Sequence, residues 1–163
     1  MKKLLIVFHS MTGGTYQMAQ AAAGGAQNEP DVVVNLIHAG AAGPNELLEA
    51  DGYIFATPEN LAMMSGVMKD LFDRTYYAAL DRIVGRPYAT LICAGSDGDN
   101  AARQIKTIAT GWRLKPIADP VIVCTYAQTP EEILAKKTIG EFDLQRCQEI
   151  GATLAAGLVL GIY

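Results

Sequence analysis

The sequence contains few cysteines and histidines, and their spacing fits neither a metal site nor a disulfide framework. Cys93, Cys124 and Cys147 are odd in number and far apart, and no CxxC pair or Cys/His cluster accompanies them. Cys93 and Cys124 lie in apolar runs, so we expect both to be buried thiols. Free thiols are typical of a reducing compartment, and we therefore predict a cytoplasmic protein.

Long hydrophobic runs and an excess of positive charge are missing as well. The apolar run at the amino terminus has only about five residues, fewer than the core of a signal peptide. The apolar carboxyl terminus is shorter than the ~20 residues that cross a bilayer. A formal net charge of −4 provides no basic surface for nucleic acid. We therefore predict that neither a membrane nor a nucleic acid is a partner.

The apolar residues alternate between short runs and helical spacing. Half of the 163 residues are hydrophobic, which suits one well-packed domain over residues 1–163. Continuous apolar runs predict strands that are buried on both faces of a sheet. These runs are Leu4–Phe8, Val32–Ile37, Gly52–Ala56, Tyr88–Cys93 and Val121–Cys124. Helical spacing between them predicts an α/β fold, in which a five-stranded parallel sheet lies between helices on both faces.

The loop after the first strand is the strongest sign of function. Residues 9–15 read His-Ser-Met-Thr-Gly-Gly-Thr and lead into a helix. Glycines let backbone N–H groups approach an anion, and the helix start and the hydroxyls add further favourable partners. Neither a GxGxxG fingerprint nor a GK[ST] P-loop occurs, which argues against a dinucleotide domain and an ATPase. The loop suits a mononucleotide phosphate held by neutral donors; the alternative is a hydroxyl-rich helix cap.

Two further loops converge on the same edge of the sheet. With the strand order 2-1-3-4-5, a ligand would bind at the carboxyl ends of the strands, where the order reverses between the first and third strands. The loop over residues 57–66 combines a proline with apolar side chains and suits a flat ring; it could equally pack on its own sheet or on a partner. The loop over residues 94–100 is rich in small residues that allow close approach, or it is a plain helix cap.

Three segments resemble the flavodoxin-like superfamily, and within it the proteins related to NAD(P)H-dependent FMN and quinone reductases. They are residues 9–15, residues 50–60 (Ala-Asp-Gly-Tyr-Ile-Phe-Ala-Thr-Pro-Glu-Asn) and residues 65–75 (Ser-Gly-Val-Met-Lys-Asp-Leu-Phe-Asp-Arg-Thr). The resemblance implies a flavodoxin-like three-layer sandwich that binds FMN. The resemblance is carried by motifs up to about Gly98. After Gly98 it rests only on the order of strands and helices.

The resemblance also implies which residues hold the cofactor. The phosphate would lie on Ser10, Met11, Thr12, Gly13, Gly14 and Thr15. The isoalloxazine ring would lie along Pro58, Glu59, Asn60 and Leu61, with its other edge at Ser96, Asp97 and Gly98. We predict no metal ligand and no catalytic acid or base from the protein, because the cofactor carries the chemistry.

Three functions follow from these residues. The first is an NAD(P)H-dependent oxidoreductase, with NADPH or NADH as donor, that reduces a quinone, a flavin or a similar small acceptor through flavin N5. The second is an electron-transfer flavodoxin that shuttles single electrons between partner proteins; such carriers dock through strongly acidic faces, which a charge of −4 with 13 basic residues fits poorly. The third is a flavin-free interaction protein, against which the intact phosphate loop counts.

The carboxyl-terminal stretch Gly157–Gly161 leaves the oligomeric state open. Its glycines and apolar residues could form a close-packed subunit interface, or they could close the sheet within one chain. We predict a homodimer, which sedimentation at micromolar concentration would check.

Overall fold

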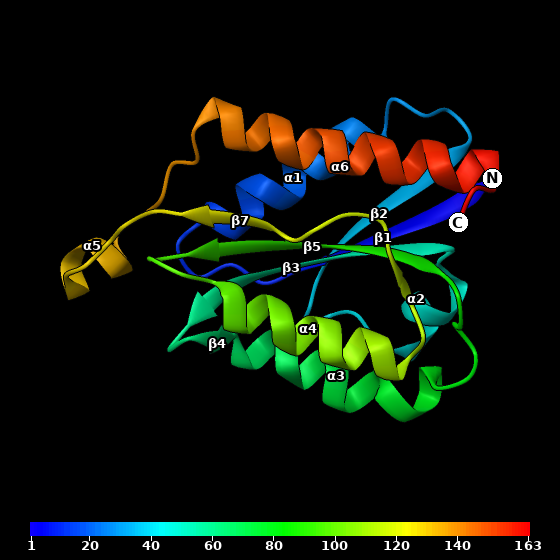
Figure 1. Ribbon diagram of the computed structural model, residues 1–163, viewed down its shortest axis with the longest axis horizontal. Helices are drawn as coiled ribbons and strands as arrows, with labels where there is room; N and C mark the ends of the chain where they lie inside the picture. Colours follow the sequence, from blue (N-terminus) through cyan, green and yellow to red (C-terminus); the bar gives the residue numbers. More distant parts are fainter.

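The computed structural model describes residues 1–163 and shows a sheet between two layers of helices (Figure 1). The strands are β1 (Lys2–Phe8), β2 (Val32–His38), β3 (Gly52–Asn60), β4 (Met63–Met64), β5 (Pro87–Ala94), β6 (Lys115–Pro116) and β7 (Val121–Cys124). The helices are α1 (Gly14–Ala26), α2 (Pro44–Glu49), α3 (Gly66–Ala79), α4 (Asp99–Gly111), α5 (Pro130–Leu134) and α6 (Glu141–Leu160).

The sheet has seven strands rather than five, and its main path runs β2-β1-β3-β5-β6. The predicted five-stranded sheet in the order 2-1-3-4-5 is therefore wrong as stated. β6 pairs with the start of β5 and β7 pairs with its end, so two segments share one edge. Pro116 and Pro120 bracket the gap between β6 and β7, and proline has no N–H to donate to a ladder, which explains the break. The short β4 pairs antiparallel with the end of β3.

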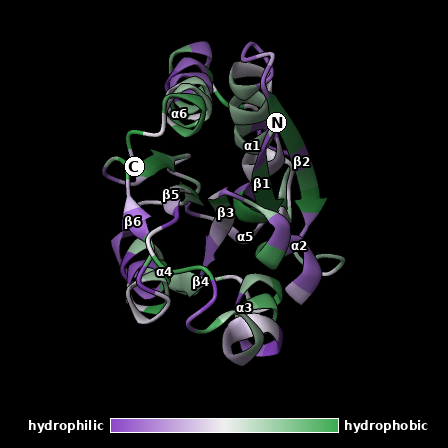
Figure 2. Cartoon of the chain, turned by 90° about the vertical axis from the view of Figure 1, so that its right-hand side faces the viewer, coloured by the Kyte–Doolittle hydropathy of each residue, from purple (hydrophilic) through white to green (hydrophobic).

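Hydrophobic cores fill both sides of the sheet. α1 and α6 cover one face, and α2, α3 and α4 cover the other (Figure 2). β3 and β5 are buried along nearly their whole length, which explains why they read as continuous apolar runs. The predicted helical stripes face these cores, as Met18, Met68, Ile105 and Leu154 are fully buried. None of the helices combines the length and the apolarity that a bilayer crossing requires.

The parallel strands place their carboxyl ends at one edge of the molecule. In Figure 1 this edge lies on the left, where the segment with α5 protrudes, and both chain termini lie at the opposite end. The loops after β1, β3 and β5 therefore meet at the edge where the predicted ligand site belongs.

Glycines allow α1 and α6 to pack with their backbones in contact. A Cβ on Gly151 would overlap the carbonyl oxygen of Ala22, and a Cβ on Gly25 would overlap that of Gln148. Nearby, the ring of Tyr163 fills the space beside Gly157, so part of the glycine-rich carboxyl terminus packs within the chain. The helix contact holds α1 in place, and with it the loop that precedes α1.

We expect Gly151→Ala to lower the free energy of unfolding by about 1–3 kcal/mol, the usual cost of overpacking a tight contact. Gly24→Ala is the matched control, because a Cβ at Gly24 meets nothing within 4 Å. Alanine there should stabilise the helix by about 0.5–1 kcal/mol. Urea unfolding measures whether the free energy of unfolding falls in Gly151→Ala and rises in Gly24→Ala. A Gly151→Ala variant as stable as the wild type would contradict the close backbone packing.

Candidate functional site

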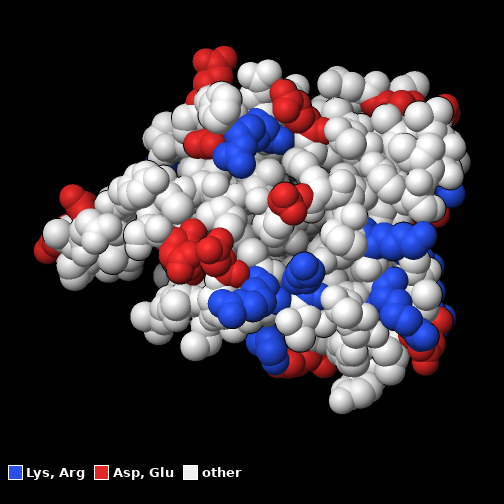
Figure 3. Space-filling view, viewed as in Figure 1, with Lys and Arg blue, Asp and Glu red and all other residues white.

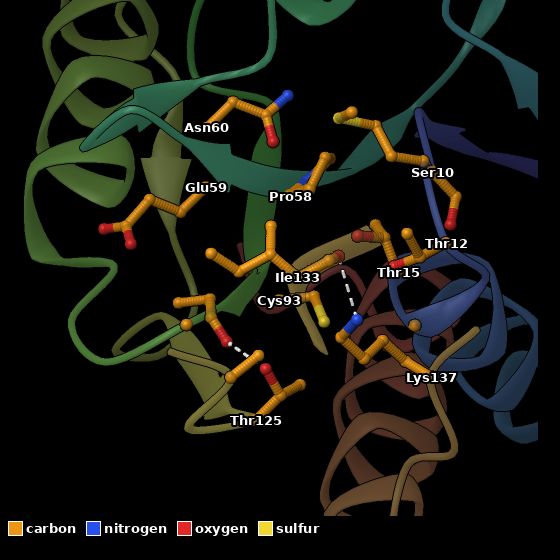
Figure 4. Close-up of a pocket in the computed structure, with 15 residues that line it drawn as sticks. Ser10, Thr12, Thr15, Pro58, Glu59, Asn60, Cys93, Thr125, Ile133 and Lys137 are labelled. Carbon is orange, nitrogen blue, oxygen red and sulfur yellow. Dashed lines mark hydrogen bonds between the residues drawn. The ribbon is translucent and has the colours of Figure 1, made fainter. Parts of the chain in front are cut away.

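Loops at the carboxyl edge of the sheet surround a cavity of about 80 Å³ that opens to solvent (Figure 4). The walls come from segments that are far apart in the sequence. The lining residues are Ser10, Met11, Thr12, Gly14, Thr15, Pro58, Glu59, Asn60, Cys93, Ala94, Gly95, Thr125, Ala127, Ile133 and Lys137.

The β1–α1 loop presents the amino-terminal end of α1 to this cavity. Gly13 is the N-cap with φ of +91°, a left-handed conformation that glycine adopts without strain. It has no side chain to cap the helix, so the first amides of α1 lack acceptors within the helix and from the cap. Ser10 Oγ shapes the loop by accepting a hydrogen bond from Gly13 N at 3.1 Å. Gly14 completes the cradle, because a Cβ there would lie 2.6 Å from Cys93 Sγ.

Thr15 carries an unpartnered hydroxyl at the wall of the cavity. The residue is only 1% exposed, and its Oγ1 has no hydrogen-bond partner of normal geometry. Its one polar influence is a small lowering of the pKa of the Cys93 thiol, and a thiol is a weak partner for a hydroxyl. A buried hydroxyl in this condition costs about 1–3 kcal/mol. An anion at the start of α1 would accept bonds from this hydroxyl and from the free amides. The residues present therefore fit a phosphate group.

The second wall is a hairpin formed by the end of β3 and β4. Its two-residue turn, Leu61–Ala62, has positive φ at both positions, which is the pattern of a type I′ turn. The turn carries strain because neither residue is glycine. The side chain of Leu61 projects outward and is 96% exposed. Asn100 Nδ2 braces the turn by donating to the Ala62 carbonyl oxygen at 2.8 Å.

Glu59 joins the second wall to the third. Its Oε2 accepts a hydrogen bond from Gly98 N at 2.5 Å, so the carboxylate caps the amide at the start of α4. A carboxylate is favourable there because the helix start carries partial positive charge. This bond fixes the distance between the two loops that would flank a flat ring.

Both thiols near the cavity have raised pKa values. Burial raises the pKa of Cys93 to about 11, so the thiol in the cavity wall is protonated at neutral pH. Cys124 is half-buried rather than buried as predicted, because it lies on the outermost strand, β7. Its pKa is also raised, first by burial and then by nearby carboxylates.

Most of the predicted cofactor residues surround this cavity. The residues that line it are Ser10, Met11, Thr12, Gly14, Thr15, Pro58, Glu59 and Asn60, whereas Gly13, Leu61, Ser96, Asp97 and Gly98 do not. Gly13 supports the lining loop as the helix cap. In the third loop it is Ala94 and Gly95 that line the cavity, because β5 continues to Ala94 and the chain turns there. That the lining residues hold FMN stays a prediction.

The wall that follows β7 was not predicted from the sequence. Thr125, Ala127, Ile133 and Lys137 line the cavity and lie beyond the strongest part of the resemblance. One signal was present, because the capping box at Thr129–Glu132 marks a helix start just after the fifth apolar run. A helix starting there lies at the carboxyl edge of the sheet, beside the other walls.

The model of the family described as NADPH-dependent FMN reductase matches residues 44–128, more than half of the 163-residue chain. The chain belongs to this family. The matched range includes the second and third walls of the cavity but not the β1–α1 loop. The phosphate loop therefore supports FMN independently of the family match.

Curated relatives match part of the chain. A flavodoxin from Aquifex aeolicus is 36% identical over 73 residues, 45% of this chain and 40% of the relative. An NAD(P)H dehydrogenase (quinone) from Acidithiobacillus ferrooxidans is 32% identical over 95 residues, 46% of this chain and 48% of the relative. The chain thus spans less than half the length of these two relatives.

Solved structures show the flavodoxin-like fold over nearly the whole chain. A flavodoxin from the domain Archaea has a TM-score of 0.78 at 22% identity and covers 96% of this chain and 99% of that one. A WrbA-like flavodoxin from Agrobacterium tumefaciens has a TM-score of 0.74 at 20% identity and covers 98% and 99%. The flavodiiron protein from Giardia intestinalis matches with a TM-score of 0.78 at 19% identity, over 98% of this chain and 37% of that one.

His9 lies beside the phosphate loop but does not line the cavity. Its ring centroid is 5.6 Å from that of His38, and its buried Nδ1 has no hydrogen-bond partner. Burial first, and then the charge of His38, lower the pKa of His9 below its ordinary value of 6.5. His9 is therefore neutral in the folded protein at pH 7.

This lowered pKa predicts a loss of stability in mild acid. The unfolded chain binds a proton at His9 more readily than the folded chain, so stability falls as the pH drops below about 6.5 and is unaffected above it. We expect His9→Gln to remove that part of the fall, measured by urea unfolding between pH 7.5 and 5. His38→Gln should keep most of it, because burial is the larger cause. Identical pH profiles for wild type and His9→Gln would contradict this account.

Proposed function

We propose that the protein binds FMN in the cavity at the carboxyl edge of the sheet. The unpartnered Thr15 hydroxyl at the free amides of α1 carries this proposal, because both need an anionic acceptor. The phosphate would lie on the β1–α1 loop. The ring would lie between the hairpin of Pro58–Asn60 and the turn at Ala94–Gly95, both of which line the cavity.

We propose further that the bound flavin serves an NAD(P)H-dependent reductase of quinones or similar acceptors. The family match and the quinone dehydrogenase relative support this activity. FMN, when bound, supplies two-electron redox chemistry between a nicotinamide donor and the acceptor. The protein contributes the shape and polarity of the site, and its own cysteines take no part.

Exposed apolar side chains around the cavity support an apolar acceptor. They project from the β1–α1 loop, the β3–β4 hairpin and the segment after β7, and they are Met11, Leu61, Met63, Tyr126, Ile133 and Leu134. Large apolar side chains left in water around one opening mark a binding surface. A quinone fits this surface better than a charged acceptor does.

An electron-transfer flavodoxin is the second candidate, and the Aquifex flavodoxin relative favours it. The negative charges of Glu59, Asp97, Asp99 and Asp143 all act on the Cys124 thiol, and Glu59 lines the cavity. Figure 3 shows acidic side chains near the base of the α5 segment, with basic side chains next to them. This mixture of charges favours the reductase over a carrier that docks through an acidic face.

The nicotinamide preference, the cytoplasmic location and the homodimer stay predictions, as does the absence of nucleic-acid and membrane partners.

The Thr15→Val variant tests two effects of the free hydroxyl, one on the stability of the protein and one on FMN binding. Removing an unpartnered buried hydroxyl should raise the free energy of unfolding of the ligand-free protein by about 1 kcal/mol. It should also weaken FMN binding about 10- to 100-fold, because a hydrogen bond to a charged group contributes about 1.5–3 kcal/mol. Urea unfolding and flavin-fluorescence titration measure the two effects. Thr107→Val, whose exposed hydroxyl donates to the Arg103 carbonyl oxygen, is a control that should leave FMN binding unchanged.

Absorption spectra of the purified protein test the proposed activity directly. We expect added FMN to bind with shifted flavin bands, and NADPH or NADH to bleach those bands rapidly under anaerobic conditions. Adding a quinone should then restore the oxidised spectrum. If neither NADPH nor NADH reduces the bound flavin, the electron carrier is favoured. Failure to bind FMN even in excess would contradict the proposal and favour a flavin-free interaction protein.

A further inference from the structure

Lys137 is the only lysine or arginine among the residues that line the cavity. It lies in the segment between α5 and α6, more than a hundred residues from the β1–α1 loop. That loop contains no basic residue of its own. A phosphomonoester carries a charge of about −1.5 to −2 at pH 7, so a nearby ammonium group would be a strong partner for it.

The backbone of Lys137 is fastened to the β1–α1 loop. Its N–H donates to the Thr12 carbonyl oxygen at 2.9 Å. Its carbonyl oxygen accepts from Gln17 Nε2 at 2.8 Å, and Gln17 Oε1 accepts from Ile139 N at 3.0 Å. Three hydrogen bonds thus hold this segment against the first turns of α1, and none of them uses the lysine side chain.

The side chain of Lys137 starts beside the phosphate cradle. A Cβ added to Gly14 would lie 3.4 Å from the Cβ of Lys137, so the lysine stem runs past the first helical residue of α1. Figure 4 shows Lys137 reaching into the space between Thr15, Cys93 and Ile133. The ammonium group lies near enough to the Cys93 thiol for its charge to lower the pKa of that thiol, against the larger effect of burial.

The ammonium group also closes the end of α5. Its Nζ donates to the carbonyl oxygens of Glu132, Ile133 and Ala135 at 2.6, 2.9 and 2.6 Å. No residue of α5 is buried, so packing contributes little to the position of this short helix. Lys137 therefore links the protruding α5, which supplies Ile133 to the cavity wall, to the start of α1.

We infer that Lys137 binds the phosphate of the cofactor and bridges it to the carboxyl end of α5. This inference rests on the proposed function and adds a charged residue to a phosphate site that is otherwise built from neutral donors. All three N–H groups of the ammonium donate to α5 carbonyl oxygens in this structure, so a bound phosphate would take over one of them while the others keep their hold on α5. The positive charge would attract both partners, because the phosphate and the carbonyl oxygens at a helix end are both negative. Phosphate binding then steadies α5 and the Ile133 side chain at the mouth of the cavity.

A simpler role would be to close α5 alone. In that case the loss of the ammonium group would disturb Ile133 and weaken every flavin to the same extent. FMN and riboflavin distinguish the two roles, because they share the ring and differ in the phosphate.

The experiment is a fluorescence titration of FMN and of riboflavin with wild type, Lys137→Gln, Lys137→Arg and Lys136→Gln at pH 7.5. Lys136→Gln is the matched control, since Lys136 is the neighbouring exposed lysine and does not line the cavity. We expect Lys137→Gln to raise the Kd for FMN about 10- to 100-fold, as expected for a charge-assisted hydrogen bond. Its Kd for riboflavin should rise far less than its Kd for FMN, and measurable riboflavin binding also shows that the variant is folded.

The Lys137→Arg variant and the salt dependence of FMN binding give two further tests. Lys137→Arg should keep most of the FMN affinity, and the weakening of FMN binding by KCl should be smaller in Lys137→Gln than in the wild type. Equal FMN affinity in wild type and Lys137→Gln would overturn the inference while leaving FMN binding intact. Parallel losses for FMN and riboflavin, or an equal loss of FMN affinity in Lys136→Gln, would also overturn it. A wild type that binds no FMN would overturn the proposed function and the inference with it.

Discussion

The close approach of α1 to its neighbours is the constraint on which the cavity depends. Gly25 and Gly151 let the backbones of α1 and α6 touch, and Gly14 lets the start of α1 lie against the Cys93 sulfur of β5. Side chains at these positions would push α1 outward. Because the free amides and the Thr15 hydroxyl move with α1, the same glycines that tighten the core also aim the donors into the cavity.

The remaining walls are fixed by hydrogen bonds between segments rather than by packing. Glu59 ties the β3–β4 hairpin to Gly98, and Gln17 ties the segment after α5 to the β1–α1 loop. These bonds cross between loops that have few buried side chains. A parallel sheet brings its loops to one edge, and specific polar contacts then set the width between them.

The sequence predicts the strands, helices and phosphate loop because these features are local. Apolar runs mark β1, β2, β3, β5 and β7, and a loop rich in glycine and hydroxyls reads as a helix start that accepts an anion. The break between β6 and β7 is different, because it depends on how the edge of β5 is shared rather than on composition. The prolines near this break are visible in the sequence, but their effect on pairing depends on the partner strand.

The wall after β7 escaped prediction for a related reason. Its residues show no apolar periodicity, since Thr125 and Ala127 precede a helix with no buried face and Lys137 follows it. What brings Lys137 to the cavity is Gln17, a residue on another helix whose amide matches two backbone groups of the segment. A contact of this kind leaves no pattern in either segment alone.

Three of the five non-glycine residues with positive φ lie around the mouth of the cavity, the other two being Asp81 and Arg113. Leu61, Ala62 and Tyr126 are non-glycine residues with positive φ, and all three lie in loops that border it. Such conformations cost of order 1–3 kcal/mol each and persist where the surroundings impose them. Leu61 and Tyr126 are also among the most exposed large apolar side chains, and contact of these side chains with water is unfavourable as well. A fold selected for stability alone would place glycine or polar residues there. Apolar side chains held outward by strained turns are better explained by a ligand that covers them, which is what a flavin ring and an apolar acceptor at this opening would do.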